Sequence, residues 1–192
     1  MPAIDVNATA VLIMDYQNEI VANFASGDES LVGRAARVLD GARQAGIPII
    51  HVVVQFRPGY PEVADRGTFK GLKDAGRLQE GSAGAQIHPG VAPQAGDVVV
   101  TKRRVGAFSG SDLEYVLRGQ GRDHLVMFGI ATSGVVLTTV RRAADLDFGI
   151  TVLADCCADR DEEVHRVLLE KILARQATVI TADEFLAALP KR

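Results

Sequence analysis

The sequence predicts an α/β protein with a doubly wound, six-stranded parallel sheet and helices on both faces, in three layers. Apolar runs of strand length alternate with segments whose apolar residues recur at helical spacing, through nearly the whole chain. The apolar runs are continuous rather than alternating, which indicates strands buried on both faces, as in a parallel sheet. Strand–helix repetition of this kind is typical of right-handed parallel crossovers.

The expected elements follow one another with short connections, except for one long irregular stretch over residues 55–97. A long irregular segment inside a compact domain more often has a function, such as ligand binding, than serves only as a connection. Serines and threonines supply expected helix N-caps: Ser109 or Ser111 for the helix predicted over 111–117, and Thr132 or Ser133 for the helix that follows the fourth strand. The predicted strands are 8–14, 47–54, 97–101, 124–128, 149–154 and 177–180, and the predicted helices are 30–45, 69–78, 111–117, 139–147, 162–174 and 182–189.

Length and composition favour one domain over residues 1–192. The chain has 192 residues, of which 47% are apolar, enough for a sizeable core. Its net charge of −3 favours neither nucleic acid nor a membrane surface as a partner, and no apolar run is long enough to span a membrane. The first residues lack the features of a signal peptide, so we expect a cytoplasmic protein that acts on a small molecule.

Three chemically useful features follow predicted strands: Asp15, Lys102 and the turn 129–135. The carboxyl ends of parallel strands are where ligands bind in such sheets. A partly buried Asp15 could serve as a general acid or base, or it could merely cap the next segment. Lys102 could hold that carboxylate or bind substrate charge; taken alone, a snorkelling edge lysine in a solvated basic cluster with Arg103 and Arg104 is the simpler interpretation.

The remaining reactive residue types give weaker signals. The four histidines show no metal-ligand spacing, so no metal site is predicted, and no cofactor is expected because G-x-G-x-x-G is absent after the first strand. G-x-S-x-G is absent too. Cys156 and Cys157 follow the fifth strand, where a thiol could react, although small buried residues are the commoner case; adjacent cysteines rarely form a disulfide with each other.

Three blocks of the sequence resemble the isochorismatase-like, or cysteine hydrolase, superfamily. They cover residues 10–18 (AVLIMDYQN), 98–113 (VVVTKRRVGAFSGSDL) and 129–136 (GIATSGVV), and Ala144 and Asp155 follow in order. Each block alone is weak evidence, but the three together are specific. The resemblance extends over nearly the full chain and implies the six-stranded fold predicted above.

The resemblance also implies roles for individual residues. Asp15 and Lys102 match the catalytic Asp and Lys of the superfamily, and an ungapped match puts Val135 where the nucleophilic Cys is found. The peptide bond Ile130–Ala131 corresponds to one that is typically cis. Since valine offers no nucleophile, a thioester mechanism cannot operate at that position.

Substrate contacts are likewise implied by the resemblance. Gln55 and Arg66 are the counterparts of residues that orient substrate in the isochorismatase branch, and the backbone from Ala131 to Val135 is expected to form an anion pocket. The expected substrate-binding residues are therefore Gln55, Arg66, Phe108, Ile130, Ala131 and Gly134. Members commonly associate, so a homo-oligomer, dimer or tetramer, is expected.

Two functions remain open on these grounds. The first is a hydrolase without a covalent nucleophile, in which Asp15 is the general acid acting on a small anionic molecule, with a vinyl ether as the candidate. The alternative is a catalytically inactive ligand-binding or oligomeric member of the same superfamily. A third, weaker idea is that Ser133, Thr138 or Cys156 replaces the nucleophile.

Overall fold

The structure is a computed structural model that describes residues 4–25, 28 and 30–190. The ends of the expected single domain, residues 1–3 and 191–192, lie outside this range. Six strands form one sheet: β1 (Thr9–Met14), β2 (Ile49–Val54), β3 (Val98–Lys102), β4 (His124–Gly129), β5 (Gly149–Leu153) and β6 (Thr178–Ile180). The α-helices are α1 (Asn18–Phe24), α2 (Leu31–Ala45), α3 (Lys70–Asp74), α4 (Leu113–Gly119), α5 (Leu137–Asp145), α6 (Glu162–Val167) and α7 (Ala182–Ala188).

The sheet confirms the predicted fold class. All strand pairs are parallel, and the order is β3-β2-β1-β4-β5-β6. β1 and β4 lie side by side at the centre, and Met14 pairs with Gly129 at their carboxyl ends. β2 and β3 are therefore added on one side of β1, and β4, β5 and β6 on the other. The point between β1 and β4, where the order of addition changes, is where ligands bind in doubly wound folds.

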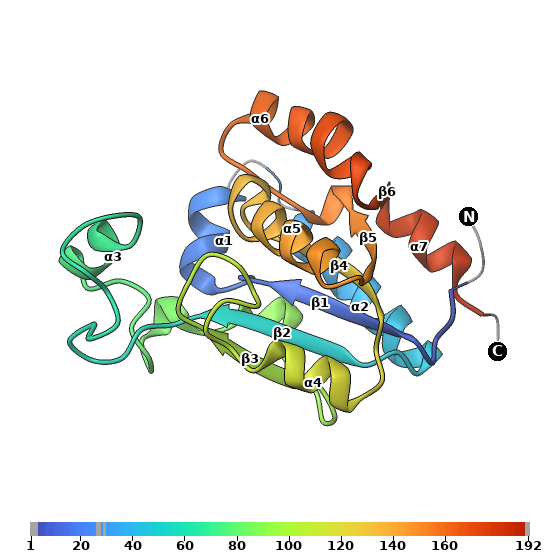
Figure 1. The fold of residues 1–192 in the computed structure, drawn as a ribbon, viewed down its shortest axis with the longest axis horizontal. Coiled ribbons are helices and arrows are strands. Elements are labelled where there is room, and N and C mark those ends of the chain that lie inside the picture. Colours follow the sequence, from blue (N-terminus) through green and yellow to red (C-terminus); the bar gives the residue numbers. More distant parts are fainter. Residues whose placement is uncertain (1–3, 26–27, 29, 191–192) are drawn as a thin grey trace.

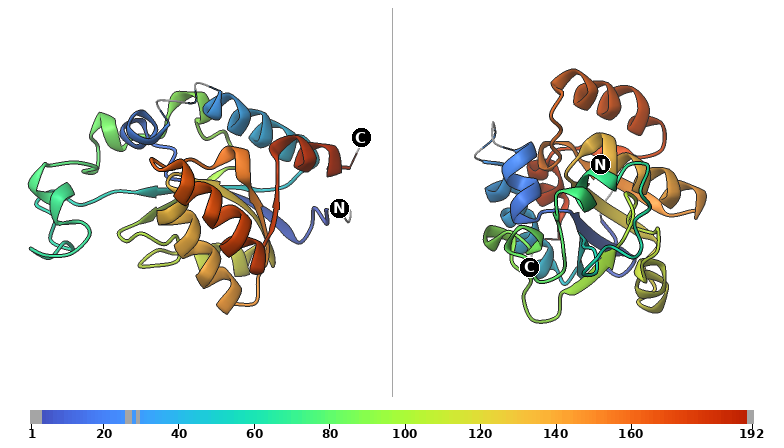
Figure 2. Two further views of the ribbon diagram at one scale, coloured as in Figure 1. Left: turned by 90° about the horizontal axis from the view of Figure 1, so that it is seen from above. Right: turned by 90° about the vertical axis from the view of Figure 1, so that its left-hand side faces the viewer.

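Helices cover both faces of the sheet (Figures 1 and 2). α1 and α2 lie on one face, where α7 packs closely against α2, and α4 and α5 lie on the other. Every residue of β1 is at most 1% exposed, because helices cover both of its faces. This burial explains why the strand consists of a continuous apolar run. No helix in the described residues is long and apolar enough to cross a membrane.

Several helix boundaries differ from the sequence prediction. α1 was not predicted, since only Ile20 of its seven residues is buried and no side chain caps it. The predicted helix 162–174 begins as α6, continues as a π turn (Leu168–Ile172) and ends as a 3₁₀ turn (Leu173–Arg175). The predicted helix 111–117 begins two residues later as α4, where the Ser111 hydroxyl accepts the Leu113 N–H at 3.4 Å.

The long stretch after β2 is mostly irregular, as predicted. It leaves the sheet, carries α3 at its far end (Figure 1) and returns to pair Phe56 with Gln79. The Phe56 ring contacts those of Tyr60 and Phe69 at centroid distances of 5.7 and 5.3 Å. This aromatic cluster gives the excursion a small core, so residues 57–78 form a lobe beside the carboxyl end of β2.

Candidate functional site

Asp15 directly follows β1, in a backbone conformation that few non-glycine residues adopt. Its φ is +59°, and its N–H still donates to Val52 O of β2 at 2.8 Å. The residue is 5% exposed. Left-handed backbone at a buried polar residue costs free energy and is frequent at functional sites. The conformation directs the Asp15 carboxylate across the carboxyl end of the sheet rather than along it.

Lys102 forms a buried ion pair with Asp15. Its Nζ donates to Asp15 Oδ2 at 2.9 Å and to Arg104 O at 3.1 Å, and Lys102 is 1% exposed. β3 is an edge strand, but the side chain runs inward over β2, so the interpretation of Lys102 as a snorkelling edge lysine is wrong. The structure thus brings together two residues that are 87 positions apart in sequence.

The Asp15 carboxyl has one oxygen without a partner. Among the described residues, its buried Oδ1 has no hydrogen-bond partner within 3.5 Å, and the nearby Val54 N–H donates to Gln17 Oε1 instead. Burial raises the pKa of Asp15 above its ordinary value, and the charge and hydrogen bond of Lys102, together with the Val54 N–H, offset part of that rise. An acceptor that is buried and unsatisfied binds a proton or a donor more readily than one in water. Asp15 therefore has the setting of a proton donor.

The turn after β4 lies next to this pair. The Ile130–Ala131 peptide bond is cis, as the resemblance implies, and a π turn (Thr132–Val136) leads into α5. Val135 is 2% exposed. A Cβ added to Gly129 would lie 3.3 Å from Val135 Cγ1, so the valine packs against the end of β4. π turns occur mostly at functional sites, where the extra residue widens the helix.

One N–H group of this turn is left without an acceptor. Thr132 donates to Ala158 O at 2.9 Å and Ser133 to Asp159 Oδ2 at 2.7 Å, while Gly134 and Val136 both donate to Ala131 O. Within the described residues, the N–H of Ala131, which precedes the π turn, has no such partner. A free N–H group at the start of a helix attracts an anion. Of the residues of the expected anion pocket, Ala131 therefore offers a free donor.

The predicted N-caps of this helix are wrong. The residue in the cap position is Ala131, which offers no side-chain acceptor. The Thr132 hydroxyl instead lies 2.8 Å from His165 Nδ1 and 3.3 Å from Ala158 O. Burial lowers the pKa of His165, although the charge of Asp159 opposes this. The segment after β5 therefore fixes the start of the turn through hydrogen bonds to Thr132 and Ser133.

Replacing Asp159 with alanine is expected to lower the free energy of unfolding by about 1–2 kcal/mol, because Ser133 N–H loses a charged acceptor. Urea denaturation measures the change. Asp112→Ala is the matched control: Asp112 is exposed and occupies the cap position of α4 without a side-chain cap bond. Equal losses in the two variants would contradict this role of Asp159.

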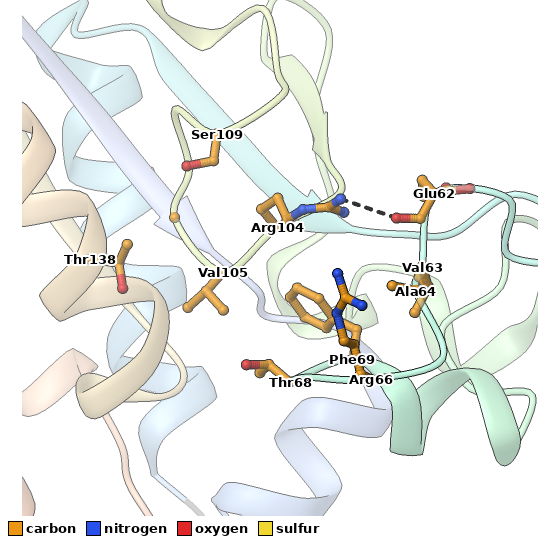
Figure 3. A pocket seen from close by; sticks show the side chains of 11 residues that line it. Glu62, Val63, Ala64, Arg66, Thr68, Phe69, Arg104, Val105, Ser109 and Thr138 are labelled. Carbon is orange, nitrogen blue, oxygen red and sulfur yellow. Dashed lines mark hydrogen bonds between the residues drawn. The ribbon is translucent and has the colours of Figure 1, made fainter.

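A cavity of about 440 Å³ is lined in part by Arg104 and Val105, in the segment that follows Lys102 (Figure 3). Arg66 and Arg104 contribute guanidinium groups to it, and Val105 separates it from the turn. A Cβ added to Gly134 would lie 3.9 Å from Val105 Cγ1, whereas Asp15 and Lys102 are not in the lining. The lining residues are Glu62, Val63, Ala64, Arg66, Thr68, Phe69, Arg104, Val105, Gly106, Ser109 and Thr138.

The other expected substrate contacts do not all reach this cavity. Gln55 donates to Ala85 O at 3.1 Å, and Ile130 is buried beneath the turn. Phe108 packs on Phe148, with ring centroids 5.9 Å apart, toward the amino end of β5. The half-buried Ala131 and Gly134 belong to the turn. Of the six residues, only Arg66 lines the cavity.

The cysteines are both free and buried. Burial raises the pKa of the Cys157 thiol to about 12 and raises that of Cys156 as well. Thiolates rather than thiols are nucleophiles, so this setting is that of inert structural cysteines. No group of three or more potential metal ligands occurs in the part of the chain that the structure describes.

Comparison with protein families decides the affiliation of the chain. The isochorismatase domain matches residues 9–184. The chain belongs to the isochorismatase family. A maleamate amidohydrolase from Pseudomonas putida is 31% identical over 188 residues, which cover 94% of this chain and 86% of that protein. A protein from Arabidopsis thaliana described as a probable inactive nicotinamidase is 32% identical, covering 82% and 84%.

Solved structures of the isochorismatase family share the fold. An isochorismatase family protein from Desulfovibrio vulgaris superposes with a TM-score of 0.84 at 28% identity, covering 94% of this chain and 99% of that one. This chain is therefore an isochorismatase-family hydrolase by descent and fold. The two curated relatives differ in their described activity, so membership of the family alone does not identify a substrate.

Sequence interpretation overlooked three residues at the site of this isochorismatase-family chain. Arg104 was assigned to a solvated basic cluster, but it lines the cavity. Asp159 and His165 contact the turn from the segment after β5. The available signal for Arg104 was its place two residues after Lys102. For the other two, nothing in the sequence indicated which backbone groups they would meet.

Proposed function

We propose that this protein hydrolyses a small anionic substrate by general-acid catalysis from Asp15, without a covalent nucleophile. The observation that carries the proposal is the buried Asp15–Lys102 pair, with its raised Asp15 pKa and its unpartnered Oδ1. A general acid needs a pKa shifted toward the working pH. Val135 supports the absence of a nucleophile, because its side chain cannot attack a carbonyl.

A vinyl ether is the substrate type that suits these groups. In this step the Asp15 carboxylic acid transfers its proton to the enol ether carbon, and the substrate becomes an oxocarbenium ion. Water then adds to the oxygen-bearing carbon of that ion and returns a proton to the Asp15 carboxylate, and the resulting hemiketal collapses to a ketone and an alcohol. Lys102 stabilises the Asp15 carboxylate that forms, and the free N–H group of Ala131 holds an anionic group of the substrate.

The cavity supplies the binding half of the proposal. Arg66 lines it, and Lys102 contacts Arg104 O, so cavity and pair share one segment of chain. In this proposal, a substrate seated in the cavity extends past Val105 toward Asp15. Four of the expected substrate-binding residues do not contact the substrate in this proposal, because they do not line the cavity; they are Gln55, Phe108, Ile130 and Gly134.

The test is a panel of enol ethers, amides and carbamates that includes isochorismate and maleamate. We expect turnover of an enol ether by the wild type and a loss of at least about 100-fold in Asp15→Asn, because the amide cannot donate the acid proton. Asp145→Asn is the control, because Asp145 is an exposed residue of α5 with no ion-pair partner among the described residues. Equal rates in wild type and Asp15→Asn, or no turnover of any compound, would refute the proposal.

The alternative function is a non-catalytic ligand-binding or oligomeric protein. Val135 and the inactive description of the Arabidopsis thaliana relative favour it. Against it, Asp15 and Lys102 face each other at 2.9 Å with no apolar side chain between them. Amidase activity gained by Val135→Cys would show that the rest of an amidase site is present. Acyl trapping with mass spectrometry tests whether Ser133, Thr138 or Cys156 forms a covalent intermediate.

A further inference from the structure

The ladder of hydrogen bonds between β1 and β2 is interrupted at Asp15. The register of the two strands, extended by one residue, places Asp15 opposite Val53, and in a parallel ladder a residue bonds to both neighbours of its partner. Asp15 N–H accordingly donates to Val52 O at 2.8 Å. At a φ of +59°, however, Asp15 O accepts the Gln17 N–H at 2.8 Å instead of the Val54 N–H. The Val54 N–H therefore loses its main-chain acceptor.

The side chain of Gln17 supplies the missing acceptor. Its Oε1 accepts the Val54 N–H at 2.9 Å, and its Nε2 donates to Val54 O at 2.9 Å and to Ala85 O at 2.7 Å. Gln17 is fully buried. The reverse orientation of the amide would turn its NH₂ group toward the Val54 N–H and its oxygen toward two carbonyls, so these bonds fix the orientation. The Gln17 amide thus replaces one rung of the main-chain ladder.

The backbone of Gln17 is itself held in place from the segment that precedes β3. Gln17 pairs with Ile87 in an antiparallel bridge, and Asn18 N–H donates to Gln86 O at 2.9 Å. A buried side chain on a fixed backbone has few rotamers open to it. The Gln17 amide therefore stays on Val54 rather than moving between partners.

The bond between Val54 and Gln17 determines which donors act on the Asp15 carboxyl. Lys102 Nζ donates to Asp15 Oδ2 at 2.9 Å, whereas the buried Oδ1 has no partner among the described residues. The Val54 N–H lies near enough to Asp15 to lower its pKa. An N–H that donates to a carboxylate stabilises the charged form. While Gln17 binds the Val54 N–H, that stabilisation is incomplete, and Oδ1 remains open to a proton.

Lys102 leaves the effect of Val54 easy to isolate. In the part of the chain that the structure describes, Lys102 is the one residue whose charge acts on the Asp15 carboxyl. Its ammonium group is bound to Oδ2 and does not contact Gln17. A change at Gln17 therefore alters a single neutral donor beside Asp15 and leaves the ion pair in place.

We propose that Gln17 is a positioning residue for Asp15: its side-chain amide binds the Val54 N–H and so leaves Oδ1 free to carry the proton that the reaction transfers. Gln17 acts through Val54 and is outside the lining of the cavity. The inference rests on the proposed function in taking Asp15 as the general acid.

NMR titration of protein labelled with ¹³C at the aspartate γ-carbon measures proton binding by Asp15, and the resonance is identified by its absence in Asp15→Asn. Methionine has the length of glutamine but no strong acceptor, so Gln17→Met releases the Val54 N–H to Oδ1. We expect Asp15 to bind its proton about tenfold more weakly in this variant than in the wild type, and its resonance to titrate at lower pH.

Gln17→Glu separates this effect from a general structural loss. Its carboxyl group lacks the NH₂ that donates to Val54 O and Ala85 O, as methionine does, but keeps an oxygen for the Val54 N–H. Its negative charge also opposes ionisation of Asp15, so we expect Asp15 to bind its proton at least as tightly as in the wild type. Weaker proton binding in Gln17→Glu would overturn the proposal even if urea denaturation shows that Gln17→Met does not fold.

Gln55→Met is the matched control for the titration. Gln55 also donates to Ala85 O, at 3.1 Å, but it does not bind the Val54 N–H. We expect the Asp15 resonance to titrate in this variant as it does in the wild type. An unshifted Asp15 titration in Gln17→Met, or a shift of the same size in Gln55→Met, would contradict the role of Gln17.

The titration needs no turnover, so it separates this inference from the proposed hydrolysis. For an enol ether that is turned over, the alkaline limb of kcat/KM marks loss of the acid proton and should move to lower pH in Gln17→Met. The expected titration shift without turnover of any compound would retain the positioning role and remove the hydrolase mechanism. Turnover lost in Asp15→Asn, together with an unshifted titration in Gln17→Met, would do the reverse.

Discussion

Lys102→Met is expected to lower the free energy of unfolding by about 3–5 kcal/mol at neutral pH, because it leaves the Asp15 charge buried without its partner. Methionine fills a similar volume, so the loss is mainly electrostatic. Urea denaturation at several pH values measures it. Lys171→Met, at an exposed position without a partner in the described residues, is the control and should change stability little.

The loss in Lys102→Met should depend on pH with a definite sign. Burial already raises the pKa of Asp15, and removing the lysine raises it further. The folded state then binds a proton more tightly than the unfolded state, so stability falls as pH rises from the ordinary value of 3.8 through the folded pKa. The destabilisation is therefore smallest in acid and largest in alkali. A loss of equal size at all pH values would contradict the buried pair.

Gly129→Ala is expected to destabilise the protein by about 3 kcal/mol, because β4 has no room for a side chain at its end. An added Cβ would lie 2.7 Å from Met14 O and 2.9 Å from Met14 Cβ, on the central strand β1. Main-chain atoms of a buried strand cannot move aside cheaply. The same clash would push the following turn away from Asp15, so activity should fall together with stability.

Gly33→Ala is the matched comparison for Gly129→Ala. Gly33 lies in α2, and nothing lies within 4 Å of its added Cβ. Alanine in a helix is favoured over glycine by about 0.5–1 kcal/mol, so this variant should be more stable than the wild type. Urea denaturation measures the free energy of unfolding of both variants. We expect it to fall in Gly129→Ala and to rise in Gly33→Ala. An undiminished free energy of unfolding in Gly129→Ala would show that β1 and β4 are less tightly packed than the structure indicates.

The sheet could be predicted because its strands are buried on both faces. Continuous apolar runs such as residues 8–14 have no other stable environment in a chain of this size, and they locate all six strands to within a residue or two. α1 could not be found in this way. It is a short helix that buries little, and Gln17 before it pairs with Ile87, a contact that spacing does not reveal.

The site was predictable where it depends on strand ends. Asp15 and Lys102 each follow an apolar run, and parallel topology brings such ends to one edge of the sheet. The π turn (Thr132–Val136) and the neighbours of its N–H groups were not predictable, since they depend on distant backbone such as Ala158 O. The same is true of Arg104, whose role follows from which carbonyls fix it rather than from its neighbours in sequence.

The position of Lys102 on β3 has a consequence for the dynamics of the site. β3 is bonded to the sheet on one side only, through β2. Edge strands open at lower free energy than central ones, and amide hydrogen exchange reports such openings. If the end of β3 detaches, Asp15 loses its counter-ion while β1 remains between β2 and β4. We therefore expect the acidity of Asp15 to be coupled to the local opening equilibrium of one peripheral strand, and we expect a ligand that bridges β3 to the rest of the protein to slow amide exchange there.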